Sequence, residues 1–153
     1  MDAFLLIKFV HVLSAIIALG FNASYGFWLG RAGQDDRLSD YALSTVKIVD
    51  NVANAFYGVL LLTGLALVFL HQLDLRTFWI GSALVLYALA VLVGVVMYRP
   101  VLARQRAALA SGGAMSAEFQ RLSSQARTLG ILTGVIVVVI VFLMVTKPMP
   151  FSS

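Results

Sequence analysis

Four long runs of uncharged, mostly apolar residues divide the chain. They cover residues 9–30, 51–70, 77–98 and 128–146, and each is 19 to 22 residues long. A helix needs roughly 20 apolar residues to cross a bilayer core about 30 Å thick. The pattern therefore predicts one all-α domain, residues 1–153, folded as a four-transmembrane-helix bundle. Its spans are predicted at about 4–30, 48–70, 77–99 and 126–147.

The composition agrees with a membrane protein. Hydrophobic residues make up 61% of the chain and charged residues 12%, against about 25% charged residues in a typical soluble domain. A soluble chain of this length could not cover four such helices. The net charge of +4 does not indicate nucleic-acid binding, because the basic residues lie between the spans. With no cysteine, disulfides, thiolate metal sites and cysteine nucleophiles are excluded.

The distribution of basic residues predicts the orientation in the membrane. Eight of them lie in the connections after spans 1 and 3, namely Arg31, Arg37, Lys47, Arg99, Arg104, Arg106, Arg121 and Arg127. The other side has three, Lys8, Arg76 and Lys147. The positive-inside rule places the richer side in the cytoplasm. We therefore expect the N-terminus and C-terminus outside, in the inner (cytoplasmic) membrane of a bacterium.

The connections carry signals for helix ends. Ser39 or Asp40 is a candidate cap for the helix leading into span 2, and Ser116 for the one leading into span 4. Pro100 predicts a bend where span 3 continues past the membrane, and residues 111–113 should break that helix. The valine-rich span 4 is expected to face lipid over much of its circumference.

Spans 1 and 2 each present one stripe of small and polar side chains at helical spacing. In span 1 it comprises Lys8, His11, Ala15, Ala18, Asn22 and Tyr25; in span 2 it comprises Asp50, Asn54, Tyr57, Leu61, Gly64, Val68 and His71. Such stripes face other helices, because lipid cannot satisfy their hydrogen bonds. The simplest account is a packing seam. The alternative is a binding site within that seam.

His11 is the strongest candidate for chemistry. At about 1.5 Å per residue it lies roughly 10 Å inside the membrane, where an ionisable side chain is a functional candidate. It could bind haem or a metal, carry a proton, or simply donate to a carbonyl, Ser14 or a tyrosine. Lys8 could snorkel to the interface or hold an anionic group. His71 lies at the outer mouth of span 2, at a different depth from His11, which argues against a bis-histidine haem.

Asp50 lies at the inner mouth of span 2 and needs a partner there. Arg31, Arg99 and Arg127 are the candidate partners for a structural ion pair, and a proton or quinone-headgroup role is the alternative. Standard catalytic signatures are missing from the sequence, so no enzyme class is predicted. Two histidines without cysteine make a structural zinc site improbable.

Three segments resemble a bacterial family described as predicted integral membrane proteins of unknown function. They are KFVHVLSA at residues 8–15, the stretch from Asp50 to the TGL at residues 63–65, and residues 74–100 from Asp74-Leu75 through Trp79 to Arg99-Pro100. The first helix also resembles the copper-resistance D-type domain and the four-helix protoporphyrinogen oxidases. In the oxidases a first-helix histidine is implicated in haem binding, which implies that role for His11. That family also uses a lysine in a later helix, and spans 3 and 4 contain none.

These observations lead to one principal expectation and two rivals. The principal one is a redox-linked protein that binds b-type haem through His11, with Lys8 and His71 at the rim of the site and no further metal. The first rival is a non-enzymatic accessory or assembly subunit of a larger membrane complex, and the second is a carrier of a small solute. The expected partners are the lipid bilayer and either other membrane protein subunits or a second copy of the chain.

Overall fold

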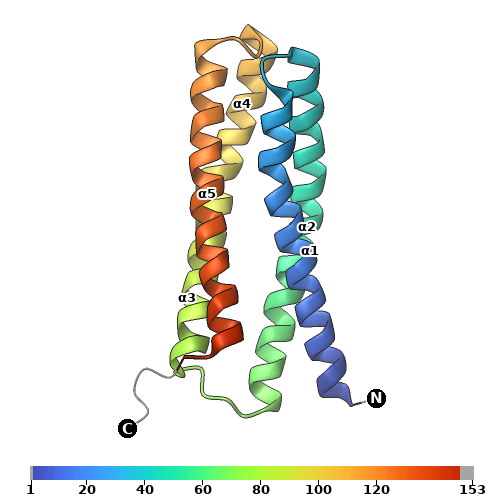
Figure 1. Ribbon diagram of the computed structural model, residues 1–153, viewed down its shortest axis with the longest axis vertical. Coiled ribbons are helices and arrows are strands. Elements are labelled where there is room, and N and C mark those ends of the chain that lie inside the picture. The colour runs from blue at the N-terminus through green and yellow to red at the C-terminus, as the bar shows by residue number, and fades with distance from the viewer. Residues whose placement is uncertain (1, 149–153) are drawn as a thin grey trace.

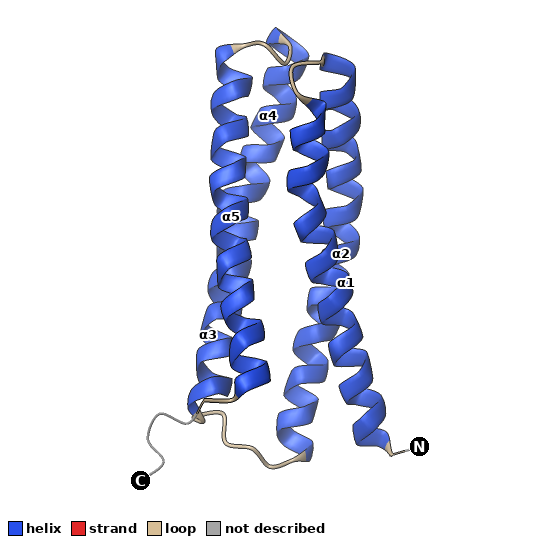
Figure 2. Cartoon of the chain, viewed as in Figure 1, coloured by secondary structure: helices blue, strands red, loops and turns tan. Residues whose placement is uncertain are grey.

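Each apolar run folds as a helix, because backbone N–H and C=O groups at membrane depth must bond within their own segment. The computed structural model describes residues 2–148, and these residues form helices and loops without any strand (Figures 1 and 2). In chain order the elements are α1 (Ala3–Ala32), α2 (Asp36–Leu70), α3 (Phe78–Leu92), the π-helical segment η1 (Val93–Tyr98), α4 (Arg99–Gly112) and α5 (Ala117–Thr146). The expected all-α fold is confirmed. Residues 1 and 149–153 of the predicted domain lie outside the described residues.

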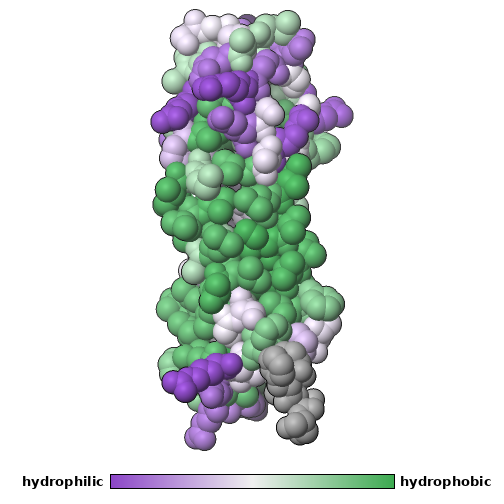
Figure 3. Space-filling model, turned by 90° about the vertical axis from the view of Figure 1, so that its left-hand side faces the viewer, coloured by the Kyte–Doolittle hydropathy of each residue, from purple (hydrophilic) through white to green (hydrophobic). Residues whose placement is uncertain are grey.

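Four helices in the described chain are long and apolar enough to cross a membrane. They are Ala3–Ala32, Asp36–Leu70, Phe78–Gly112 and Ala117–Thr146. Few of their residues are fully buried in the bundle, and many large apolar side chains are exposed. Figure 3 shows these side chains as a broad hydrophobic belt with hydrophilic residues above and below it. Lipid chains cover a belt of this kind. The protein is therefore a multi-pass integral membrane protein with four candidate spans.

The helices are arranged as two hairpins. In the first, α1 packs along α2; in the second, α5 packs along the continuous helix formed by α3, η1 and α4 (Figure 1). The hairpins meet where α2 contacts α4 and α1 contacts α5. Among the described residues no Cα atom of α2 lies within 8 Å of a Cα atom of α3. We call the end with loops 33–35 and 113–116 the loop end, and the opposite end, with residues 2 and 148, the terminal end.

Two clusters of buried apolar residues lie in the half of the bundle nearer the loop end. One cluster comprises Leu43, Ala108, Leu109, Ala114, Phe119 and Leu122. The other comprises Tyr25, Val46, Tyr98 and Ala126. Both combine residues of the two hairpins, so apolar packing joins the hairpins at this end. Which side of the membrane the loop end faces stays a prediction.

The ends of α2 and α5 are capped by acidic and hydroxyl side chains. Asp35 accepts a hydrogen bond from the Leu38 N–H at 2.8 Å and so caps α2. The expectation of a cap at Ser39 or Asp40 is therefore wrong: both lie inside the helix, which begins at Asp36. The reason is that Asp35 already offers an acceptor at the first position where the chain can turn into a helix. Ser116 caps α5 as predicted.

The continuous helix α3–η1–α4 adapts to Pro100 by widening instead of ending. Because Pro100 has no N–H, it cannot donate to the carbonyl of residue 96, and its ring needs room in the preceding turn. The six-residue π segment Val93–Tyr98 lies directly before it, and π segments absorb such a local mismatch. The helix then continues to Gly112, and Gly113 takes a positive φ of 73° that ends it. The predicted break at residues 111–113 is confirmed.

Candidate functional site between helices α1 and α2

The two polar stripes predicted from the sequence face each other along the α1–α2 hairpin. Their contacts form three groups, spaced from the terminal end towards the loop end. These are the groups around His11, around Tyr57, and around Asp50. Ser14 and Ala18 on α1, and Ala53 on α2, are fully buried between the groups. Small side chains let the two backbones approach, and this proximity brings the polar groups within hydrogen-bonding distance.

His11 reaches across from α1 and contacts the backbone of α2. Its Nδ1 lies 3.0 Å from the Leu60 carbonyl oxygen and 3.1 Å from Thr63 Oγ1. A carbonyl oxygen can only accept, so Nδ1 carries the proton and donates to it. The carbonyl partner was among the alternatives weighed from the sequence, whereas Thr63 was not. Thr63 lies one position outside the predicted stripe, next to Gly64, and its hydroxyl also bonds the Val59 carbonyl at 2.7 Å.

In the Nδ1–H tautomer of His11 the other ring nitrogen, Nε2, is unprotonated and carries a lone pair. No donor among residues 2–148 hydrogen-bonds to Nε2. The ring is half-buried and lies directly against Gly64, where the missing side chain makes room for it. The imidazole is therefore held in one tautomer and one orientation with one nitrogen available to bind a ligand.

Lys8 and His71 lie near each other at the terminal end, where both approach the Phe4 ring. The His71 ring makes an edge contact with Phe4 at a centroid distance of 4.1 Å, and Lys8 Nζ lies 6.0 Å from the same Phe4 ring. Phe4 precedes His11 by seven residues, about 10 Å along the helix axis. His71 is exposed. The structure thus brings Lys8 and His71 to a common rim around Phe4. His71 is about two helical turns from the level of His11, whereas Lys8 precedes His11 by three residues, which is about one turn.

The middle group links three helices. Asn22 on α1 donates a hydrogen bond to the Tyr57 hydroxyl on α2. Tyr87, from the second hairpin, donates to the Tyr57 backbone carbonyl at 3.0 Å. Tyr87 was not singled out from the sequence. It could have been recognised, because a hydroxyl in the middle of an otherwise apolar span needs a hydrogen-bond partner on a neighbouring helix.

The third group surrounds the Asp50 carboxylate. Asn54 donates to Oδ2 at 2.9 Å, the Tyr25 hydroxyl donates to Oδ1 at 3.3 Å, and Arg99 Nη2 lies 3.4 Å from Oδ2. Of the three arginines considered as partners, Arg99 is the one that pairs with Asp50. Tyr25 also stacks on Tyr98, with centroids 6.4 Å apart and planes inclined by 15°. The carboxylate is fully engaged, which fits a structural ion pair joining the two hairpins.

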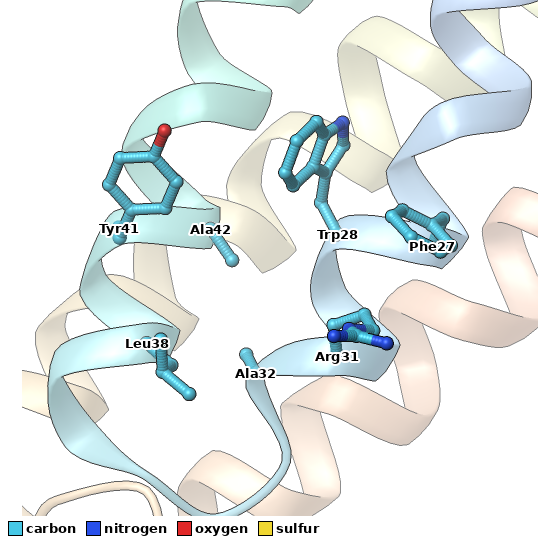
Figure 4. Close-up of a pocket in the computed structure, with 7 residues that line it drawn as sticks. All are labelled: Phe27, Trp28, Arg31, Ala32, Leu38, Tyr41 and Ala42. Carbon is cyan, nitrogen blue, oxygen red and sulfur yellow. The ribbon is translucent and has the colours of Figure 1, made fainter.

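Two cavities lie near the loop end. The first has a volume of about 440 Å³ and lies between α1 and α2, as Figure 4 shows with Trp28 on one side and Tyr41 on the other. The second, of about 350 Å³, lies between α2 and α4 and includes Asp50 and Arg99 in its lining. His11 lines neither cavity. Within residues 2–148 no three His, Asp or Glu side chains gather as a metal-binding group.

Comparison with known proteins assigns the family. Neither curated proteins nor solved structures give a match. A family model described as "Predicted integral membrane protein (DUF2269)" matches residues 5–148. This range includes all four candidate spans almost completely, together with the His11, Tyr57 and Asp50 groups. The chain therefore belongs to the DUF2269 family of predicted integral membrane proteins.

Proposed function

We propose that this membrane protein binds b-type haem in a redox-linked role, with His11 as the axial ligand. The observation that carries the proposal is the state of the imidazole. Its Nδ1–H is bound to the Leu60 carbonyl, and Nε2 is left without a donor among residues 2–148. Histidines that bind metals typically donate their other ring N–H to a carbonyl or carboxylate, which fixes the tautomer and raises the basicity of the ligating nitrogen.

The terminal-end rim supplies the complementary charge. Lys8 is exposed and is placed over the Phe4 ring, so its ammonium group can pair with a propionate of a bound haem. His71 contacts the same Phe4 ring. Both residues are nearer the terminal end than His11, Lys8 by about one helical turn and His71 by about two. This suits a ligand whose apolar ring enters the membrane while its carboxylates stay at the interface.

The geometry supports one axial histidine, not two. His71 follows Gly64, the residue against the His11 ring, by seven positions, and this separates them by about 10 Å along α2. The two imidazoles are therefore not placed to bind opposite faces of the same iron. A haem held by His11 would supply one-electron or ligand-binding chemistry. The chain's own contribution is to hold Nε2 deprotonated and oriented.

The visible spectrum of the detergent-purified protein tests the proposal. After expression with ample haem, we expect a Soret band that shifts on reduction with dithionite and is lost in His11→Ala. Imidazole added to His11→Ala should restore the band, because it replaces the missing ligand without changing the fold. Gln72→Ala, a neighbour of His71 with no role in the site, should retain the wild-type spectrum. A colourless wild-type protein, or a His11→Ala variant with an unchanged spectrum, would overturn the proposal.

A non-enzymatic accessory subunit is the second candidate, and one observation favours it. The hairpins are joined by buried apolar clusters near the loop end, while α2 and α3 stay apart. Helices that are not packed on each other inside the chain can pack on a partner subunit in the inner membrane. If that is the function, the protein is colourless and co-purifies in fixed proportion with a larger membrane protein, and His11 serves to join α1 to α2.

A further inference from the structure

The second cavity is a basic site between the two hairpins. It lies between α2 and α4 and has a volume of about 350 Å³. Its lining comprises Leu43, Lys47, Asp50, Asn51, Arg99, Leu102, Ala103 and Arg106. Three of these side chains are cationic and one is anionic, so the cavity carries two net positive charges. It lies at the opposite end of the hairpin from Lys8 and His71, and the haem proposal makes no use of it.

The single carboxylate does not neutralise the whole cavity. Asp50 is already engaged by Arg99 at 3.4 Å and by the Tyr25 and Asn54 side chains. Lys47 and Arg106 form no ion pair with any residue between 2 and 148. Two cations therefore face the cavity without a counter-charge from the described chain.

The spacing of the cationic residues along α2 and α4 puts their side chains on the helix faces that line the cavity. On α4, Arg99 and Arg106 are seven positions apart and so share one face, with Leu102 and Ala103 between them. Arg106 points across to α2, where its Nη2 lies 3.3 Å from Ser44 Oγ. Ser44 is three positions before Lys47, which brings the Lys47 side chain to the same face of α2. The cavity is thus a cleft with cations on both walls.

The apolar part of the lining indicates the kind of anion. Leu43, Leu102 and Ala103 complete the walls. The cavity lies where the uncharged runs 51–70 and 77–98 end on the side of the loop end, because Asp50 directly precedes the first run and Arg99 directly follows the second. Arginine and lysine bind phosphate oxygens through charge-assisted hydrogen bonds. Basic pockets between membrane helices are suited to lipid headgroups. We propose that this cavity binds the phosphate group of an anionic phospholipid in the leaflet at the loop end.

A lipid titration of the purified protein tests the proposal. The protein in a neutral detergent is titrated with phosphatidylglycerol, phosphatidylcholine or inorganic phosphate, and retained lipid is counted by native mass spectrometry. We expect one phosphatidylglycerol to be retained in preference to phosphatidylcholine. Each lost cation should weaken binding about fivefold, the effect of one basic residue near an anionic membrane surface. Lys47→Gln/Arg106→Gln should therefore bind phosphatidylglycerol about 25-fold more weakly.

Matched variants separate the cavity from general surface charge. Arg37→Gln/Arg104→Gln removes two cations from the same two helices, α2 and α4, but neither residue lines the cavity. It should keep nearly wild-type affinity. Lys47→Gln alone changes an exposed, unpaired side chain, so the fold is preserved and about a fivefold loss remains measurable. Equal losses in both double variants would overturn the proposal, as would saturation by inorganic phosphate without preference for the lipid.

Discussion

Gly64 lies directly against the imidazole of His11. A Cβ atom at position 64 would come within 3.0 Å of His11 Cε1 and 3.4 Å of Nδ1. The ring therefore fills the space that a side chain on α2 would otherwise occupy. This contact explains why a small residue stands in the polar stripe of span 2 one turn from the Leu60 carbonyl, and it makes the orientation of His11 dependent on a glycine.

Gly64→Ala should displace the His11 ring and weaken its bond to Leu60. Overpacking of a tight contact costs typically about 1–3 kcal/mol, which exceeds the gain of about 1 kcal/mol that alanine brings to a helix. We expect a lower melting temperature in detergent and, if haem is bound, a weaker Soret band. Gly58→Ala on the same helix is the control, because nothing lies within 4 Å of its added Cβ. That variant should be as stable as the wild type or more so, and equal melting temperatures for the two variants would contradict the prediction.

Thr63→Val should loosen the α1–α2 seam by a measurable but modest amount. The substitution keeps the shape of the side chain and removes the hydroxyl 3.1 Å from His11 Nδ1. Hydrogen bonds between membrane helices contribute about 0.6 kcal/mol on average and up to about 1.7 kcal/mol. Thr133→Val is the matched control, since within residues 2–148 its hydroxyl bonds only the Leu129 carbonyl of its own helix. Thermal unfolding of the two variants should show the larger loss for Thr63→Val.

Tyr87→Phe should weaken the connection between the hairpins. The Tyr87 hydroxyl donates to the Tyr57 carbonyl at 3.0 Å, and it joins helices whose Cα atoms stay more than 8 Å apart. Loss of that bond should cost about 1 kcal/mol. Hydrogen exchange of the amides around residue 57 should become faster in the variant. Tyr41→Phe, an exposed tyrosine near the loop end, should leave both stability and exchange unchanged.

Asp36→Ala should separate the two loops at the loop end. Asp36 Oδ1 accepts a hydrogen bond from the Ala114 N–H at 2.5 Å, and its carboxylate also lies about 3.1 Å from where a Cβ on Gly113 would be. Removing the acceptor leaves the buried amide of Ala114 unsatisfied, which costs about 1–3 kcal/mol. Protease cleavage within residues 111–117 should accelerate. Asp40→Ala, an exposed residue one turn further along α2, should be cleaved at the wild-type rate.

The sequence predicts best those features that depend on residues close together in the chain, such as spans and helix faces. The length of an apolar run against the thickness of a bilayer predicts four spans, and the spacing of His11, Asn22 and Tyr25 on one helix face follows from the helical repeat alone. The caps show the limit of such reasoning. The cap of α5 was predicted correctly at Ser116. For α2 the sequence suggested Ser39 or Asp40, whereas Asp35 is the cap because the chain turns into the helix there.

What only the tertiary structure decided is which side chains meet across helices. The sequence left three arginines open for Asp50, and the packing of α4 on α2 selects Arg99. It left several acceptors open for His11, and the register of α1 on α2 selects the Leu60 carbonyl and Thr63. The rotation and register of neighbouring helices depend on how all their side chains pack together. The sequence by itself therefore determined a four-span membrane bundle with one polar seam, whereas the partners within that seam are a property of the folded bundle.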